Sequence, residues 1–476
     1  MKSNFGTAEI IASVESNVQG LGMIAFDSGR AEDEAWLSSA FERPPEFDLI
    51  SGPRSAVILG SAGSGKSAIH DALVRISLTE DWKPQRLLVK WNPNPPSTDA
   101  QLDSGLVDRQ LAQVLDACAW TLLQHVTHYL SDYDAAPKWA RTFILWFIRT
   151  YLTGNFEFRT GRLRAELDAA GEKLVDQIAE SPQSDLFGPD VAASTVLAEL
   201  IKAIGELHLA GVWVLVDRLE GWSDMDPTRL STGLSAFFST LGLFEQAGFA
   251  YKIFLDSTMM PQLATVSGIV RRRIDLHYLH WNCLQLTNLL LKRIALAIGK
   301  PVASLDEICT DKSIPEWFER CGGMTPRGWL ELARPLVAAY LERAYDGTAK
   351  PITREEWVEI RRRHPPLLLL NEETGQLWVG MREINDLPEG QLKLLAYLYR
   401  NAGQTCSRSE LHYLADRGLS HIPHTHDDAW EPPKSYSGKL DTAIWRLREN
   451  IEPDPDDAPL YIQTEKGKGY RLENAH

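Results

Sequence analysis

One short segment of the sequence has the residue types and spacing needed to hold a chain of phosphates. The segment reads GSAGSGKS and fits the pattern GxxxxGK[ST] at every fixed position. Glycines let backbone N–H groups converge on phosphate oxygens, and a lysine adds a full positive charge at the β and γ positions. A chance glycine turn is the alternative. The predicted nucleotide-binding residues are Gly60, Ser61, Ala62, Gly63, Ser64, Gly65, Lys66 and Ser67.

The elements around this loop are those that the chemistry requires. The apolar run Ala56 to Leu59 predicts a strand before it, and Ser67 to Ile76 follows a helical pattern after it. Lys66 is expected to meet the β- and γ-phosphates and to take part in catalysis. Ser67 is expected to be a ligand of Mg²⁺.

Two carboxylates follow another apolar strand. The segment GVWVLVDRLE, residues 211–220, resembles a Walker B motif and puts Asp217 directly after the strand Val212 to Val216. Ligands bind at the carboxyl ends of parallel strands, so Asp217 can hold Mg²⁺ through water, and Glu220 is placed to orient an attacking water. Because Arg218 stands between the two acids, Glu220 can also be a solvated turn residue.

Two other polar clusters are candidates for contact with the γ-phosphate. The segment LDST, residues 255–258, ends a further strand, and Ser257 is our sensor candidate there. An ordinary polar turn has the same sequence features. The run Arg271, Arg272 and Arg273 ends the next helix, where a resemblance to AAA+ proteins implies a finger that reaches the ATP of a neighbouring subunit. The alternative is a solvated basic helix end.

The pattern of strands and helices predicts an α/β fold with a parallel sheet covered on both faces. Four strands alternate with helical segments, with a long helical insertion at about 101–207. The predicted parts are an N-terminal segment (1–49), a P-loop domain (50–282), a helical lid (283–346), a linker (347–365) and an α+β domain (366–476).

Residues 50–346 resemble the STAND and AAA+ classes of P-loop ATPase, on the motifs quoted above. A further motif, Gly322-Gly323-Met324-Thr325-Pro326-Arg327, resembles the lid motif of those classes. The resemblance implies ATP as the nucleotide, Mg²⁺-dependent hydrolysis, and contact between Arg327 and the nucleotide. The helical insertion is not matched by the resemblance, so the clade stays open.

The C-terminal part resembles the winged-helix effector domain of the OmpR/PhoB type. The resemblance extends over the whole domain and implies that Ser437 to Ile451 is the recognition helix and Tyr461 to Leu472 the wing. Other matching segments are Leu367 to Val379 for the opening hairpin, Leu387 to Asn401 for the first helix and Ser407 to Ala415 for the second.

The residues of this helix support the resemblance. Leu440, Ile444, Leu447 and Ile451 recur at helical spacing and predict one buried face. The DNA-contact candidates are Lys439, Thr442 and Arg446 on the helix, with Lys466, Lys468 and Arg471 on the wing.

The charge of this domain leaves a second interpretation open. Residues 366–476 contain 12 Lys and Arg against 18 Asp and Glu, a net charge of −6, although binding to phosphate requires basic surface. Seven of the 12 basic residues lie within 434–448 and 461–471, with only Asp441 and Glu465 as acids there. The domain therefore binds duplex DNA or uses the winged helix for protein contacts.

Composition limits the remaining possibilities. The 476 residues have a net charge of −15, which argues against a chain built throughout to bind nucleic acid or anionic lipid. The five cysteines are scattered singly, as in a reducing compartment, and no apolar run follows the N-terminus, so we expect a cytoplasmic protein without a membrane span. The histidines at 421, 424 and 426 are metal ligands by type, but their irregular spacing favours a solvated loop.

Two functions fit the sequence. The first is an ATP-dependent switch of the STAND/AAA+ type that acts on DNA or transcription through the winged helix. The second is an ATP-driven, oligomerising component of a bacterial conflict or defence system, whose winged helix docks a protein partner.

Overall fold

The computed structural model describes residues 21–26, 40–78, 84–93, 106–180, 192–216, 219, 227–239, 246–264, 274–345, 350–454 and 458–475. The chain divides into two compact units, one of residues 43–280 and one of residues 1–42 and 281–476. Among the described residues, no helix has the length and apolar character to cross a membrane.

The first unit is built on a five-stranded parallel sheet. The strands are β1 (Ala56–Gly60), β2 (Leu87–Trp91), β3 (Val212–Val216), β4 (Phe249–Asp256) and β5 (Asp275–Tyr278), in the order β2-β3-β4-β1-β5. This arrangement confirms the predicted α/β fold. The sequence did not indicate β5, because it is a short edge strand whose residues are only partly buried and lack a continuous apolar run.

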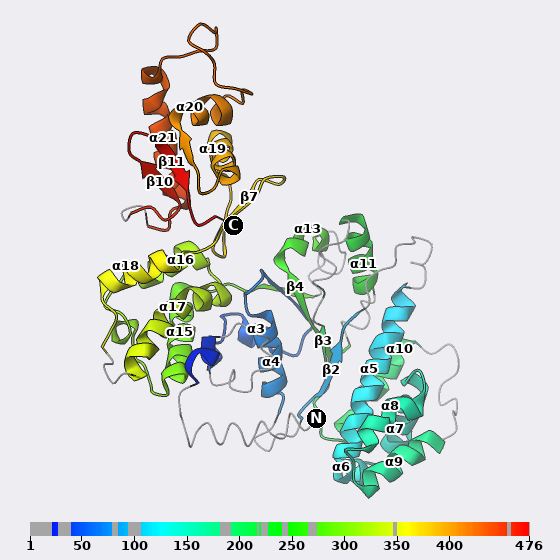
Figure 1. Cartoon of the computed structure of the whole chain (residues 1–476). Coiled ribbons are helices and arrows are strands. Elements are labelled where there is room, and N and C mark those ends of the chain that lie inside the picture. Colours follow the sequence, from blue (N-terminus) through cyan, green and yellow to red (C-terminus); the bar gives the residue numbers. More distant parts are fainter. Residues whose placement is uncertain are drawn as a thin grey trace. The chain divides into compact units, whose positions relative to one another are not determined.

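Helices cover both faces of this sheet (Figure 1). Helix α4 (Lys66–Ile76) lies on one face, where the ring of His70 is 5.8 Å from that of Phe254. Helix α5 (Leu106–His128) packs on the other face within a core that includes Val57, Val214 and Ile253. The rest of the insertion comprises α6 (Leu130–Ala135), α7 (Lys138–Tyr151), α8 (Phe156–Arg164), α9 (Ala169–Glu180) and α10 (Ala193–Gly205), and α11 (Pro227–Ser239) follows β3.

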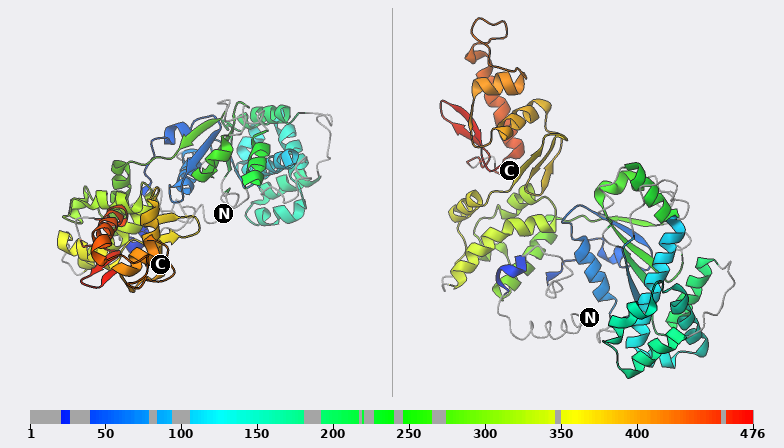
Figure 2. Two further views of the ribbon diagram at one scale, coloured as in Figure 1. Left: turned by 90° about the horizontal axis from the view of Figure 1, so that it is seen from above. Right: turned by 45° about the vertical axis from the view of Figure 1, so that its right-hand side comes forward.

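The second unit contains a helical part with its own core. Its helices are α15 (Cys283–Ile298), α16 (Ile314–Gly322), α17 (Pro326–Tyr345) and α18 (Arg354–Arg363). Trp329 and Trp357 are buried in this core, although Trp357 lies in the stretch expected to be a linker. The N-terminal turn η1 (Gly22–Phe26) packs against these helices (Figure 2). Nη1 of Arg293 donates to the carbonyl of Ala25 at 3.0 Å.

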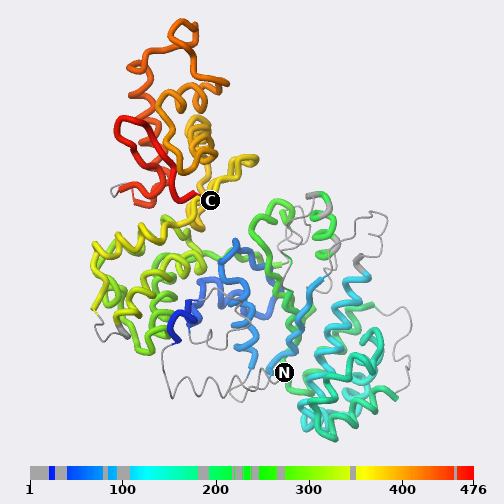
Figure 3. Tube along the Cα trace, in the orientation of Figure 1, coloured from blue at the N-terminus to red at the C-terminus, as the bar shows by residue number. Residues whose placement is uncertain are grey.

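The winged-helix domain has two small antiparallel sheets around three helical segments, and Figure 3 follows its chain to the wing. Helix α21 packs on the others through the face that the sequence predicted, Leu440, Ile444, Leu447 and Ile451. The elements are β6 (Leu368–Asn371), β7 (Gln376–Val379), β8 (Arg382–Ile384), α19 (Glu389–Arg400), β9 (Thr405–Ser407), α20 (Arg408–Glu410), η7 (Leu411–Asp416), α21 (Pro433–Ile451), β10 (Ile462–Glu465) and β11 (Gly469–Leu472).

A buried lysine holds the segment that leads into β1. The Nζ of Lys252 donates to the carbonyls of Gly52 at 2.7 Å and Arg54 at 2.6 Å and lies 5.2 Å from the ring centroid of Trp213. Burial lowers the pKa of Lys252 from 10.5 to about 7. The ammonium is therefore costly to bury, but a neutral amine can still donate to both carbonyls.

This lysine should make the stability of the P-loop domain depend on pH. Between pH 7 and 10.5 the unfolded chain holds a proton at Lys252 that the folded chain releases, so stability falls as pH falls through this window and levels off below it. Replacing Lys252 with Met keeps an apolar chain of similar length and removes the titration. We expect the free energy of unfolding of the parent to rise more than that of Lys252→Met between pH 7 and pH 9.5. Equal changes in urea titrations would contradict this assignment.

Candidate functional site

The phosphate loop has the backbone geometry that its sequence predicts. A Cβ added at Gly60 would lie 2.2 Å from the Oγ of Ser64, so a side chain at Gly60 would collide with the turn of the loop. Gly63 and Gly65 have φ angles of 78° and 90°, which L side chains rarely adopt. Gly65 also caps α4, whose first N–H groups and positive dipole end therefore face the loop.

Lys66 lies inside the curve of this loop. Its side chain is buried, and Nζ donates to the carbonyls of Gly60 at 2.7 Å and Ser61 at 3.0 Å. A full positive charge is thus held in the loop by two backbone carbonyls. Ser67 follows in the first turn of α4 and is partly exposed.

A carboxylate of the neighbouring strand lies beside this charge. The last residue of β4, Asp256, is the register partner of Gly60, and its Oδ2 lies 3.8 Å from Nζ of Lys66. The other oxygen, Oδ1, accepts hydrogen bonds from the backbone N–H and hydroxyl of Thr258. The sequence led us to choose Ser257 at this strand end, and that role stays a prediction. The structure adds Asp256, whose proximity to Lys66 depends on the pairing of β4 with β1.

Strand order places β4 between the strand of the phosphate loop and β3. Strand β3 ends at Val216, so its carboxyl end lies at the same edge of the sheet as that of β4. Asp217, Glu220 and the arginines 271–273 lie outside the described residues, and their roles remain predictions.

The described residues fit the phosphates of a nucleotide. A side chain at Gly60 would collide with Ser64, α4 begins directly after the glycine turn, and Lys66 supplies the positive charge. Hydroxyl and carboxylate oxygens are ligands that Mg²⁺ prefers, and Ser67 and Asp256 supply one of each near the loop.

The segment that resembles a lid motif, Gly322 to Arg327, lies in the second unit. Arg327 is exposed in the first turn of α17, which begins at Pro326. The hydroxyl of Thr325 accepts from the N–H of Gly328 at 3.2 Å and so caps the helix. Contact between Arg327 and a nucleotide remains a prediction.

The second candidate site is the exposed face of α21 with the wing. Lys439, Thr442 and Arg446 are exposed on the helix, and Lys466 and Lys468 are exposed in the turn between β10 and β11. These five candidates are accessible for contacts with a partner.

Two charged residues near this face are already paired within the chain. Arg471 lies 3.2 Å from Glu465 and 2.6 Å from Glu473, so its charge is offset. The expected recognition helix contains one acid before Glu449, which is Asp441. Its carboxylate accepts hydrogen bonds from Arg408 at 3.0 Å and from the hydroxyl of Tyr470 at 2.6 Å. These partners lower the pKa of Asp441 despite its partial burial.

An exposed aromatic side chain on α21 was not singled out from the sequence. Trp445 is 57% exposed and lies beside Arg446 on the face turned away from the domain core. Its signal in the sequence was its position between the buried Ile444 and Leu447, outside the apolar stripe. A large ring there offers an apolar contact to a thymine methyl or to a protein.

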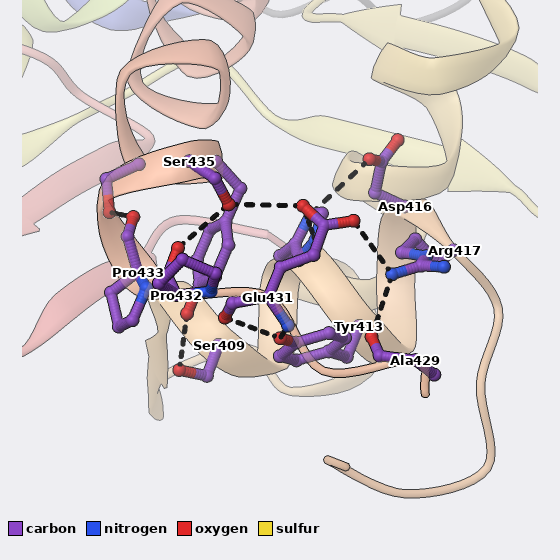
Figure 4. Close-up of polar contacts among 12 residues, drawn as sticks. Ser409, Tyr413, Asp416, Arg417, Ala429, Glu431, Pro432, Pro433 and Ser435 are labelled. Atoms are coloured by element: carbon purple, nitrogen blue, oxygen red, sulfur yellow. Dashed lines mark hydrogen bonds and ion pairs between the residues drawn. The ribbon is translucent and has the colours of Figure 1, made fainter. Parts of the chain in front are cut away.

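A polar cluster fixes the point where α21 begins (Figure 4). The carboxylate of Glu431 accepts from Arg417 Nη1 and Ser435 Oγ, each at 3.1 Å. The hydroxyl of Tyr413 donates to the carbonyl of Glu431 and accepts from its N–H. The loop before α21 is therefore anchored at its C-terminal end.

The histidine-rich part of this loop is exposed, as expected for a solvated loop. His421, His424 and His426 all face solvent, and the N–H of His424 donates to Asp427. Over the described ranges of the chain, no group of three or more His, Cys, Asp or Glu is arranged to hold a metal ion.

No protein-family model and no curated protein sequence matches this chain. Among solved structures, the DNA-binding domain of Klebsiella pneumoniae RstA, in complex with the RstA box, is 26% identical, covers 22% of this chain and 89% of its own, and has a TM-score of 0.17. The ORC2 protein of Aeropyrum pernix, in its ADPNP–ADP complexes, is 12% identical, covers 96% of this chain and 95% of its own, and has a TM-score of 0.35. The ORC1 protein of the same organism, in complex with DNA, is 12% identical, covers 89% and 88% and scores 0.32. The fold assignment rests on the strand order and the phosphate loop rather than on these scores.

Replacing Lys66 with Ala should weaken the binding of ATP. Hydrogen bonds from a charged group contribute about 1.5–3 kcal/mol, which corresponds to roughly a tenfold to 150-fold change in affinity. Titration with a fluorescent ATP analogue measures the effect, and Lys90→Ala, an exposed lysine of β2, is the control. Parental affinity in Lys66→Ala would show that the loop does not bind phosphate.

Replacing Asp256 with Asn should slow ATP turnover more than it weakens binding. The amide keeps an acceptor for Thr258 but removes the negative charge that positions Lys66. Misplacing a group that contacts the phosphates costs up to about 100-fold in rate, so we expect kcat to fall by roughly tenfold to 100-fold with KM little changed. Ser257→Ala tests the neighbouring candidate in the same assay. If only Ser257→Ala slows turnover, Asp256 has no such role.

Proposed function

We propose that this protein is an ATP-dependent molecular switch of the STAND/AAA+-like type, which couples ATP binding and hydrolysis to binding of duplex DNA. The observation that carries the proposal is a phosphate loop with a buried Lys66 in the same chain as a winged helix with an exposed basic face. Transcriptional regulation is the role that this combination supports best.

The chain's own residues have separate roles in this proposal. Lys66 and the loop amides bind the β- and γ-phosphates, and Ser67 with Asp217 would hold Mg²⁺. Asp217 and Glu220 are the proposed catalytic carboxylates, with Glu220 orienting the attacking water. Asp256 positions Lys66 through the 3.8 Å contact between their charged groups. ATP turnover is therefore proposed to be Mg²⁺-dependent.

The winged helix would read DNA with the outer face of α21. Lys439, Thr442 and Arg446 are proposed to contact bases or phosphates in the major groove, and Lys466 and Lys468 to contact flanking phosphates. Arg471 is the weakest of the candidates, because Glu465 and Glu473 already pair with it. The pairing of Asp441 with Arg408 removes one acid from competition with phosphate.

Two observations favour a second function. Trp445 is an exposed ring on the helix that carries the proposed DNA contacts, and the domain has a net charge of −6. Exposed aromatic residues beside arginine are typical of protein-binding hot spots. The alternative we propose is a component of a bacterial conflict or defence system that oligomerises with ATP and docks a protein through the winged helix.

Binding of the full chain to duplex DNA at varied salt separates the two functions. Phosphate contacts release counterions, so the DNA-binding function requires affinity that falls steeply with salt. Lys468→Ala should reduce the slope of log K against log salt by about 1. Arg446→Ala should cost about 1–3 kcal/mol if it contacts a base.

The matched control is Lys393→Ala, an exposed lysine on α19 that pairs with Glu389. It should leave both the affinity and the salt slope at the parental values. If the full chain fails to bind duplex DNA at low salt, where attraction is greatest, the DNA-binding function is excluded and the protein-docking function is favoured.

A further inference from the structure

The end of α21 is held by arginines from outside the helix. Arg382, the first residue of β8, donates from Nη2 to the carbonyl of Asn450 at 3.1 Å. Arg320 of α16 donates from Nη1 to the carbonyl of Pro453 at 3.4 Å. One of these two arginines belongs to the helical part of the unit and the other to the hairpin of the winged helix.

A third arginine, Arg361 of the helical part, is buried beside two tryptophan rings. Arg361 of α18 is 5% exposed, and its guanidinium lies 5.7 Å from the ring centroid of Trp317 and 5.8 Å from that of Trp357. Its Nη1 lies 3.4 Å from Oδ2 of Asp454. The two rings desolvate the cation and attract it electrostatically, so its partner carboxylate matters more than at a surface site. We call the three residues Arg320, Arg361 and Arg382 the arginine clasp.

The position of the clasp suits the end of a helix. The last carbonyls of an α-helix have no partner within the helix and carry the negative end of its dipole. Asn450 is one residue before the end of α21, and its carbonyl accepts from a guanidinium. Within the clasp, Arg382 therefore caps the C-terminal end of the helix that we propose to read DNA, and Arg320 and Arg361 hold the segment that follows it.

A backbone contact joins the same two parts a short distance away. The N–H of Met381, in the turn between β7 and β8, donates to the carbonyl of Cys321 at 2.9 Å. Gly380 has a φ of 59°, and a Cβ there would lie 2.4 Å from the same carbonyl, so the hairpin approaches α16 as closely as a glycine permits.

This contact lies next to the lid motif. Cys321 is in the last turn of α16, and the motif Gly322 to Arg327 follows it directly. The indole N–H of Trp329 donates to the carbonyl of Gly323, which ties the motif to the first turns of α17. The motif, the hairpin and α16 are therefore joined by close backbone contacts.

We propose that the arginine clasp and the contact between Met381 and Cys321 make the helical part and α21 move as one body, and that nucleotide bound near Arg327 sets DNA affinity through it. This inference rests on the proposed function. It adds the route of regulation, which runs from the lid motif through α16 and α18 to the end of α21. Coupling between two sites requires such a connected element whose position both ligands affect.

The affinity of the full chain for a random-sequence duplex, measured with a non-hydrolysable ATP analogue and with ADP, tests the route. The parent should show a ratio of the two affinities of about fivefold or more. Arg361→Ala should bring the ratio close to 1, while the affinity for the ATP analogue stays parental. The control is Arg363→Ala, an exposed arginine of the same helix that pairs with Glu359, and it should keep the parental ratio.

A second variant and a second measurement address a loss of folding in Arg361→Ala. Asp454→Asn removes the carboxylate charge of the same ion pair, at a residue that is only partly buried. It should also lower the ratio of the two DNA affinities. Hydrogen exchange at the Met381 amide reports the docking without DNA. It should be slow in the parent and faster in both variants, while the amides of α19 stay protected as evidence of a folded domain.

The outcomes separate the inference from the proposed function. If both variants keep the parental ratio and slow exchange at Met381, the clasp is not the route, although the switch stands. If the parent binds duplex with the same affinity in both nucleotide states, the switch and its route are both excluded. If the parent does not bind duplex, the proposed function fails, and rapid exchange of Met381 in the parent would then overturn the clasp as well.

Discussion

The candidate nucleotide site depends on one buried ammonium group. Nζ of Lys66 is held by two carbonyls of its own loop and lies near the carboxylate of Asp256 on the adjacent strand. The two carbonyls and the carboxylate stabilise this charge, and the glycine turn brings the carbonyls around it. The parallel sheet supplies the rest, since it brings the carboxyl ends of β1, β3 and β4 to one edge.

The helical part and the winged helix of the second unit follow a different principle. Each has its own apolar core, and the polar contacts described between them are made by the guanidinium groups of Arg320 and Arg361 and by backbone. As a general rule, polar interfaces of this kind let two parts change position relative to one another. Arg361 is an exception to that rule, because its guanidinium is buried beside two tryptophan rings and also pairs with Asp454.

The face of α21 shows why fold and charge must be considered together. By sequence the domain is acidic, yet the acid nearest the helix centre is paired with Arg408 and Tyr470. The exposed basic residues of this face are Lys439, Arg446 and the lysines of the wing. Arg471 instead pairs with Glu473. The exposed surface of this helix and wing is therefore more favourable to phosphate binding than the net charge of the domain suggests. The exposed ring of Trp445 also suits contact with a protein partner.

The amino-acid sequence by itself determined the local features: the phosphate loop, four of the five strands, and the buried stripe of α21. These depend on residues that are contiguous or recur at a fixed spacing, so propensity and periodicity reveal them. The tertiary structure alone decided that Asp256 lies beside Lys66, that β5 completes the sheet, and that three arginines meet the end of α21 and the segment after it. Each of these joins residues distant in the chain, and strand order and packing between helices leave no local pattern in the sequence.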